Sequence, residues 1–408
     1  MDFSLTPQQQ ALVEQIRVYV RDVVAPARTR LDRLETAADF PWDVMAPGAA
    51  LGLKTLPLPT DLGGAGADHL TLALVAEELA IGDVSVCYYF RHYWRFARVI
   101  ARGLAPGPRA MILDRLLHDE RFVPASAMTE PRAGSDNALP HDAPGEGAML
   151  SVRRERDDWV LNGQKRMVTN AGIASVYFVF GRTDPTVGIS TGLTMFLVPV
   201  ETPGLQVGPT YQKLGQRTSP QADLSFEECR IPFEYAVTEV GSGFEAHERA
   251  MVSANITNGA MAVGLARAAY ERALHWSTER VQGGRLLYQH QLVGHELGQM
   301  CAQIEAARSL VWRAAWTLGQ GGSTAASELS WAARVVGTQM AITVTQQAMH
   351  LFGGWGIMND WPVEKLVRDA LTLTHGNGTN PLMLLKLGTL QAEQERGRID
   401  AIGVDRHA

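Results

Sequence analysis

The amino-acid sequence predicts a mostly α-helical chain with one β domain in its middle. Apolar residues recur at helical spacing in the first and last thirds of the chain. Between about 123 and 235 the sequence changes to short β-prone runs separated by Gly, Pro, Asn and Asp. This order of helical, β and helical segments predicts three domains, at 1–122, 123–236 and 237–408.

In the first third, helices are expected at 12–24, 70–81 and 85–101, and the Pro- and Gly-rich stretch 57–64 is expected to be a loop. In the middle, strands are expected at 159–161, 176–180, 193–200 and 222–226, with a surface loop at 137–147. The last third is expected to form a helical bundle that includes helices at 263–276, 292–316 and 332–351.

Composition excludes several classes of protein. The 408 residues include 37 basic and 43 acidic side chains, and the net charge of −6 argues against nucleic-acid binding. With 46% hydrophobic and 20% charged residues, the chain is expected to fold as an ordinary globular protein. Neither an export signal nor a membrane span is expected. Cys87, Cys229 and Cys301 are scattered, so we expect no disulfide framework, no metal site and a reducing, cytoplasmic location.

Four motifs, in order along the chain, resemble those of acyl-CoA dehydrogenases. Residues 127–136 read AMTEPRAGSD, 162–171 read NGQKRMVTNA, and 213–219 read KLGQRTS. The fourth match is FGGWG at 352–356, followed by PVEKLVRD at 362–369. Four motifs in matching order, covering nearly the whole chain, are far more specific than one.

The resemblance implies an N-terminal helical domain, a β-barrel-like middle domain and a C-terminal four-helix bundle. It implies non-covalent FAD, an acyl-CoA thioester substrate, and an electron acceptor such as electron-transfer flavoprotein. It also implies a homodimer or homotetramer that binds neither nucleic acid nor a membrane. The expected reaction is α,β-dehydrogenation of the acyl group.

Cofactor residues follow from the resemblance, position by position. Hydroxyl, amide and cationic donors are the groups that a flavin and its pyrophosphate require from a protein. Arg280 would contact the pyrophosphate of a neighbouring subunit's FAD. The implied cofactor-binding residues are Met128, Thr129, Ser135, Met167, Thr169, Arg280, Gln282, Gln291, His350, Gly353, Gly354 and Thr379.

The catalytic base of the family is missing from this sequence. Many members carry a Glu directly before Gly-Thr, and here Asn377 precedes Gly378 and Thr379. An amide oxygen is too weak a base to take an α-proton. In other members the Glu lies at a position that corresponds to about Ala254, next to Asn255. Asn377 therefore marks the expected catalytic position, and His375 is the nearest titratable group in sequence.

Other interpretations of the missing Glu remain open. His92, Tyr93, Glu248 or His375 could supply the base. Alternatively the protein is a flavin-dependent monooxygenase, a redox-neutral thioester elimination or cleavage enzyme, or a catalytically inactive FAD-binding homologue.

The residues 90–102 also bear on the substrate, because Arg91, Arg95, Arg98 and Arg102 fall on one face of a helix. That face is either a solvated basic surface or, near Arg91, a site for a polar or anionic acyl group. The neighbouring Tyr88, Tyr89, Tyr93 and Trp94 would suit a ring-bearing acyl group or belong to the core. By resemblance, Ser135, Arg91 and Gly378 would contact the substrate.

Overall fold

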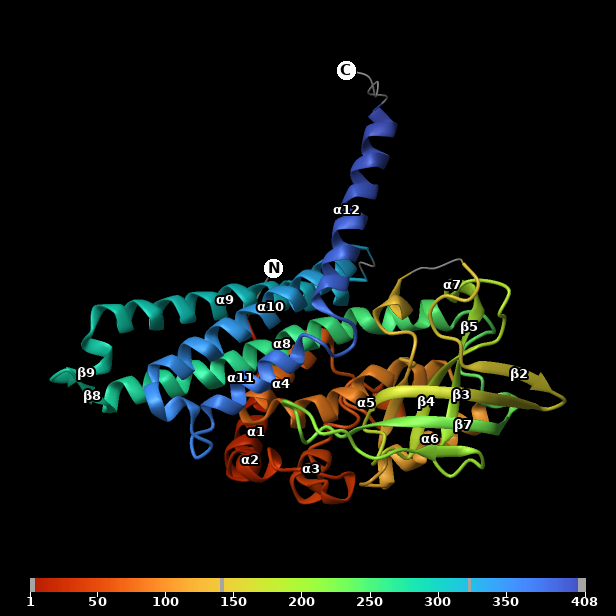
Figure 1. Cartoon of the computed structure of the whole chain (residues 1–408), viewed down its shortest axis with the longest axis horizontal. Coiled ribbons are helices and arrows are strands. Elements are labelled where there is room, and N and C mark those ends of the chain that lie inside the picture. The colour runs from red at the N-terminus through yellow and green to blue at the C-terminus, as the bar shows by residue number, and fades with distance from the viewer. Residues whose placement is uncertain (1–3, 140–142, 322–323, 403–408) are drawn as a thin grey trace.

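The structure, a computed structural model, describes residues 4–139, 143–321 and 324–402. Residues 1–3 and residues 140–142 of the predicted loop 137–147 lie outside the described residues. Helices from both ends of the sequence pack beside each other, and the β-sheet lies at one end of the molecule (Figure 1). This arrangement confirms the predicted fold class.

Six α-helices make up most of residues 4–118 in the N-terminal region. They are α1 (Pro7–Tyr19), α2 (Ala25–Leu31), α3 (Trp42–Ala50), α4 (His69–Gly82), α5 (Val84–Arg102) and α6 (Pro106–His118). The predicted helices at 70–81 and 85–101 are α4 and α5, and residues 57–64 form turns and a short 3₁₀ helix as expected.

The helix predicted at 12–24 begins earlier and changes character before it ends. Thr6 and Gln9 form a capping box that starts α1 at Pro7. After Tyr19 the chain forms a π-helical turn, Val20–Val24. This wider turn comes just before Pro26, which has no N–H to donate to the preceding turn.

The middle region is one curled sheet of seven strands (Figure 1). The strands are β1 (Pro124–Ala127), β2 (Ser151–Glu155), β3 (Asp158–Thr169), β4 (Val176–Arg182), β5 (Leu193–Pro199), β6 (Leu205–Val207) and β7 (Gln221–Pro232), with the short helix α7 (Ile189–Gly192). The order is β1-β4-β2-β3-β7-β6, and β5 pairs with β4. The four predicted strands lie in β3, β4, β5 and β7.

Strands β1, β2 and β6 were not predicted. They have three to five residues, and β2 and β6 are largely exposed. Their hydrogen-bond partners are the longer strands β4, β3 and β7. Such short strands depend on their neighbours rather than on a pattern of their own.

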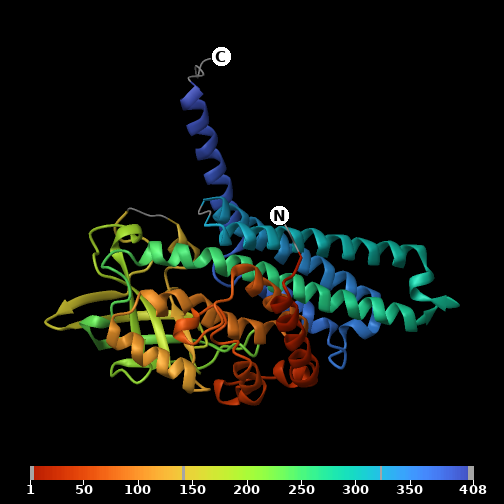
Figure 2. The same cartoon turned by 180° about the vertical axis from the view of Figure 1, so that it is seen from behind.

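The C-terminal region contains long helices, as predicted. They are α8 (Gly243–Glu279), α9 (Gln291–Gly319), α10 (Thr324–Leu351), α11 (Val363–Leu373) and α12 (Asn380–Ile402), with a hairpin of β8 (Val281–Gln282) and β9 (Arg285–Leu286). Helices α8 to α11 pack against one another, whereas α12 projects away from the body (Figure 2). In the described part of the chain, no helix is long and apolar enough to span a membrane.

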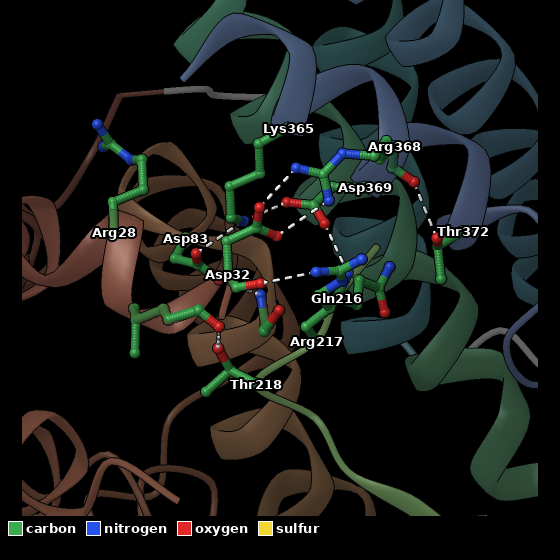
Figure 3. A network of polar contacts seen from close by, with 12 residues as sticks. Arg28, Asp32, Asp83, Gln216, Arg217, Thr218, Lys365, Arg368, Asp369 and Thr372 are labelled. Carbon is green, nitrogen blue, oxygen red and sulfur yellow. Dashed lines mark hydrogen bonds and ion pairs between the residues drawn. The ribbon is translucent and has the colours of Figure 1, made fainter. Parts of the chain in front are cut away.

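A buried ion network joins all three regions (Figure 3). Lys365 Nζ lies 2.9 Å from Asp83 Oδ2 and 2.5 Å from Asp369 Oδ2. The other oxygen of Asp369 accepts a hydrogen bond from Gln216 N at 2.6 Å. We call Asp83, Lys365 and Asp369 the Lys365 network.

A further ion pair and a further hydrogen bond lie beside the Lys365 network (Figure 3). Arg368 pairs with Asp32, at 2.5 Å between Nη2 and Oδ2. Thr218 donates a hydrogen bond to Leu31 O at 2.8 Å. The third sequence motif, 213–219, therefore lies where it ties the middle region to α2 and α11.

Candidate functional site

The first two motifs are hydrogen-bonded to each other where β1 ends beside β3. Arg166 N donates to Thr129 O at 2.8 Å. The buried Lys165 Nζ donates to Met128 O at 3.0 Å and pairs with Glu130 at 2.6 Å. Further along β3, Thr169 Oγ1 accepts a hydrogen bond from Gln221 Nε2 at 3.1 Å. The predicted flavin residues Met128, Thr129 and Thr169 thus belong to one hydrogen-bonded platform.

Two further predicted flavin residues are exposed near this platform. Met167 is 55% exposed, with a left-handed backbone (φ 54°) at an irregularity in the pairing of β3 with β7. Ser135 begins a 3₁₀ turn after Gly134 and is also exposed. Both side chains are therefore free to contact a ligand.

A second group of predicted cofactor residues lines one cavity of about 480 Å³ at the C-terminal end of α8. Its lining includes Arg280, Gln282, His350, Gly353 and Gly354. The rings of Trp276 and Phe352, which also line it, stack at 5.0 Å. Gly353 has φ 59°, and neither Gly353 nor Gly354 has an atom within 4 Å of an added Cβ. A cationic donor beside an open glycine backbone fits a pyrophosphate.

Two predicted cofactor residues do not join these groups. Gln291 is the exposed first residue of α9 and is not part of the cavity lining. Thr379 Oγ1 accepts a hydrogen bond from Leu382 N at 3.4 Å, where it caps the start of α12.

The sheet that carries the platform lies beside the first part of α8, whereas the cavity lies at the other end of this helix, near Arg280 (Figure 1). This helix has 37 residues, which corresponds to a length of about 55 Å. The platform and the cavity are therefore described as separate sites of one chain. The residues present fit FAD if each cofactor is held by the platform of one subunit and the cavity of another.

Asn377, which the sequence marks as the expected catalytic position, lies among arginines. Arg95 Nη1 donates to Asn377 Oδ1 at 3.2 Å, and Asn377 Nδ2 donates to Tyr88 Oη at 3.2 Å. The guanidinium of Arg91 lies over the Tyr88 ring, 4.6 Å from its centroid. Asn377 itself has φ 59°, a left-handed conformation that Asn adopts more readily than most residues.

Ala254 and Asn255, at the other position considered for the base, are hydrogen-bonded to arginines of the same group. Arg91 Nη1 donates to Ala254 O at 3.2 Å. Arg334, which is fully buried on α10, donates to Asn255 Oδ1 at 3.0 Å and to Asn377 O at 2.9 Å. Arg334 also bonds the carbonyl oxygens of Gly376 and Gly378. We call Arg91, Arg95 and Arg334 the arginine cluster.

Among the residues that the structure describes, the arginine cluster has no acidic partner. Within residues 4–139, 143–321 and 324–402, none of its three guanidinium groups forms an ion pair. The Nε atoms of all three and Nδ2 of Asn255 are buried without a hydrogen-bond acceptor. Each such donor costs about 1–3 kcal/mol when it stays unsatisfied. Burial and the neighbouring Arg91 lower the pKa of Arg95 to about 10, which leaves it charged at neutral pH.

Two histidines beside the cluster are neutral. Burial and the charge of Arg91 lower the pKa of His92 to about 3. Burial and the charge of Arg95 hold the pKa of His247 well below its ordinary value. Neither imidazole therefore offsets the positive charge or adds to it at neutral pH.

The geometry does not favour the residues that the sequence offered as alternative bases. His375 is exposed, with Nδ1 2.9 Å from Thr374 Oγ1. Tyr93 is buried and donates to Phe122 O at 2.7 Å, and burial raises its pKa well above the usual value. Glu248 pairs with Lys386 at 2.6 Å. With a pKa of about 3, His92 is a weak base.

The aromatic and basic residues of α5 divide between core and surface. Tyr89, Tyr93 and Trp94 are buried core residues, and Trp94 Nε1 donates to Leu53 O at 2.6 Å. Arg98 and Arg102 are exposed, whereas Arg91 is 2% exposed. The interpretation of this face as a solvated surface is therefore wrong for Arg91.

Sequence reasoning missed Arg334 and the polar role of Tyr88. An arginine among the small and apolar residues Ala333, Val335 and Gly337 of a helix is a signal that could have been noticed. In the described ranges, no three His, Cys, Asp or Glu side chains gather as a metal ion would require.

Comparison with known proteins gives a consistent result over the whole chain. Residues 6–117 match the acyl-CoA dehydrogenase N-terminal domain, residues 125–229 its middle domain, and residues 241–389 its C-terminal domain. A probable acyl-CoA dehydrogenase of Mycobacterium leprae is 31% identical over 381 residues, which are 93% of this chain and 94% of that protein.

Solved structures of similar proteins have the same fold as this chain. Butyryl-CoA dehydrogenase from Megasphaera elsdenii superposes with a TM-score of 0.88 and 30% identity, covering 96% of this chain and 100% of that one. PigA, solved with FAD and proline, has a TM-score of 0.87 at 23% identity, covering 96% and 99%. The likeness to PigA concerns the fold alone.

Proposed function

Since this chain belongs to the acyl-CoA dehydrogenase family and is an FAD-dependent oxidoreductase, we propose that it dehydrogenates an acyl-CoA thioester whose acyl group is polar, anionic or ring-bearing. FAD, when bound, supplies the acceptor for the hydride that leaves the β-carbon. The observation that carries this proposal is the assembly of the cofactor residues into a β1–β3 platform and a glycine-lined cavity.

The residues that would hold FAD are divided between two subunits in this proposal. Thr129, Thr169 and Met167 would contact the flavin, while Arg280 and Gly353 of a neighbouring subunit would contact the pyrophosphate. This division between subunits requires a homodimer or homotetramer. Electron-transfer flavoprotein is the proposed electron acceptor, and a cytoplasmic location remains a prediction of the sequence.

Anaerobic titration with acyl-CoA esters tests the proposed reaction. The purified holoenzyme should be yellow, and at least one ester with a polar, anionic or ring-bearing acyl group should bleach the flavin absorbance. If no ester of this panel reduces the flavin, the proposed dehydrogenation is wrong.

Arg280→Ala tests the shared cofactor site separately. Losing a charge-assisted hydrogen bond should weaken FAD retention by about 1.5–3 kcal/mol, measured as FAD release on dilution. The exposed Arg313→Ala on α9 serves as the control. A monomer in light scattering that holds a full complement of FAD would contradict the shared site.

Asn377 and Ala254, at the two family positions of the base, favour a second candidate. A flavin-dependent monooxygenase needs no carboxylate there, and it would consume oxygen in the presence of reduced flavin without an acyl-CoA. Redox-neutral elimination or cleavage of a thioester, and FAD binding without turnover, are the remaining alternatives. Oxygen uptake and product analysis of the same reactions distinguish them.

A further inference from the structure

The arginine cluster gathers hydrogen-bond donors from three helices at one buried place. Arg91 and Arg95 lie one turn apart on α5, Asn255 lies on α8 and Arg334 on α10. The buried polar atoms of these four side chains that have no hydrogen-bond partner are the three arginine Nε atoms and Asn255 Nδ2. All four are donors, so the group that would complete this site is a hydrogen-bond acceptor.

The charge of the site narrows the kind of acceptor. Three guanidinium groups form hydrogen bonds around Ala254 and Asn377, and His92 and His247 beside them are neutral at neutral pH. The nearby acidic side chain on α8, Glu248, pairs with Lys386 at 2.6 Å. A buried place with excess positive charge and unused donors matches an oxyanion in both charge and hydrogen bonding.

Arg334 holds the backbone of this site through several hydrogen bonds, whereas Arg91 and Arg95 form fewer hydrogen bonds. Arg334 bonds three successive carbonyl oxygens, those of Gly376, Asn377 and Gly378. Arg91 bonds one carbonyl oxygen, that of Ala254. Arg95 contacts only neutral partners, Asn377 Oδ1 and His247 Nδ1. Arg91 and Arg95 are therefore the side chains most available to a ligand.

We propose that Arg91 and Arg95 bind a carboxylate carried by the acyl group of the thioester, close to its thioester end. The proposal rests on the proposed function, which supplies the thioester. Arg95 bonds Asn377, and the family resemblance gives that position the group that acts at the α-carbon. A carboxylate at Arg95 therefore lies few bonds from the α-carbon, so a short dicarboxylic acyl group fits better than a long one. A cationic acyl group is repelled.

The test compares thioesters that differ only at the end of the acyl chain. Binding of succinyl-CoA and butyryl-CoA to the holoenzyme is measured by calorimetry, so the result does not depend on turnover. We expect succinyl-CoA to bind roughly 10- to 100-fold more tightly, as one or two charge-assisted hydrogen bonds would give. Adipyl-CoA should gain less over hexanoyl-CoA than succinyl-CoA gains over butyryl-CoA.

Variants of α5 assign the effect to the cluster. Arg91→Met and Arg95→Met should bring the succinyl-to-butyryl ratio close to one, while butyryl-CoA binding persists. Arg98→Met, the same change on the exposed part of the same helix, should leave the ratio unchanged. Thermal unfolding of each variant checks that a lost preference is not lost folding. A ratio that survives both Met variants overturns the proposal.

Further outcomes separate this inference from the proposed function. If both esters bind equally and the flavin is still reduced by an acyl-CoA, only the carboxylate site is wrong. If neither ester binds, the proposed function is wrong and this inference falls with it. Free acetate is the probe for a second source of the anion. Acetate binding that depends on Arg91, without a preference for succinyl-CoA, overturns the acyl-borne carboxylate in favour of a free anion.

Discussion

Helix α5 and the segment from α11 to the start of α12 meet at two buried charged sites of opposite design. At the start of α5, the Lys365 network sets one ammonium between two carboxylates. Two to three turns further along α5, the arginine cluster sets three guanidinium groups beside Asn377 and Ala254, with no acidic partner in the described ranges. In the first site the cation has carboxylate partners, and in the second the cations have none in the described ranges, so we call them the complete and the incomplete site.

This difference in charge pairing distinguishes a site that stabilises the fold from a proposed binding site within one interface. Burial alone would lower the pKa of Lys365, yet Asp369 and Asp83 raise it above its ordinary value. In the arginine cluster, burial and Arg91 lower the pKa of Arg95, because no carboxylate opposes them. A buried charge with partners holds the regions together, and a buried charge without partners is available for binding.

The largest expected effect comes from breaking the complete site. Lys365→Met leaves Asp83 and Asp369 buried without their cation, which should lower the free energy of unfolding by about 3–5 kcal/mol. Denaturant unfolding of the FAD-bound protein measures it. Arg30→Met removes the surface pair with Asp43 (2.6 Å) and should cost no more than about 1 kcal/mol. A loss below 1 kcal/mol in Lys365→Met would remove the basis of the comparison.

Adding a carboxylate to the incomplete site should change catalysis. Asn377→Glu restores an acid at the family position, and anaerobic flavin reduction by a straight-chain saturated acyl-CoA should rise at least about tenfold, part of the 10²–10⁴ typical of a general base. Arg95, which bonds Asn377 Oδ1, would pair with the new carboxylate and limit the gain.

His375→Ala is the companion variant, and it should not change the rate, because His375 is exposed and bonded to Thr374. Fast reduction by the wild-type enzyme that neither variant alters would show that the base lies elsewhere.

The histidines beside the arginine cluster should make the protein sensitive to acid. His92 has a folded pKa of about 3, below the value of about 6.5 in an unfolded chain. Its contribution to stability is therefore complete above pH 6.5 and is lost as the pH falls towards 3, by about 1.4 kcal/mol per pH unit. Unfolding measured between pH 7 and 4.5 tests this slope.

His92→Gln should make that slope shallower, and His295→Gln, at an exposed position of α9, should not. Arg95→Met should also reduce the slope, because Arg95 helps to lower the pKa of His247. A slope that is identical in all three variants would mean that other groups govern the acid sensitivity.

The smallest expected effect is on the stability of the incomplete site. Arg95→Met removes an unpaired buried charge together with two hydrogen bonds to neutral partners. These changes oppose each other, so the free energy of unfolding should change by less than about 1 kcal/mol. A loss as large as that of Lys365→Met would show that the cluster holds the fold in the same way as the Lys365 network.

Much of the fold could be predicted from local sequence. The helices at 70–81 and 85–101 and four strands were found because their periodicity is carried by consecutive residues. The start of α8 was missed, since Asn255, Thr257 and Asn258 interrupt the apolar pattern expected of a helix. In the structure these residues are buried, and Thr257 donates to Ser253 O at 3.1 Å. Contacts from α4 and α10 stabilise this part of the helix against its own propensity.

The sequence by itself determined the order of the three regions and the family motifs, because each is written in neighbouring residues. Only the tertiary structure decided that Ala254, Arg334 and Asn377 meet, and that Arg91 is buried while Arg98, two turns along the same helix face, is exposed. Helical spacing fixes which side chains share a face. Whether a charge on that face meets water, an acid or a vacant binding site depends on segments more than a hundred residues away, which no local pattern records.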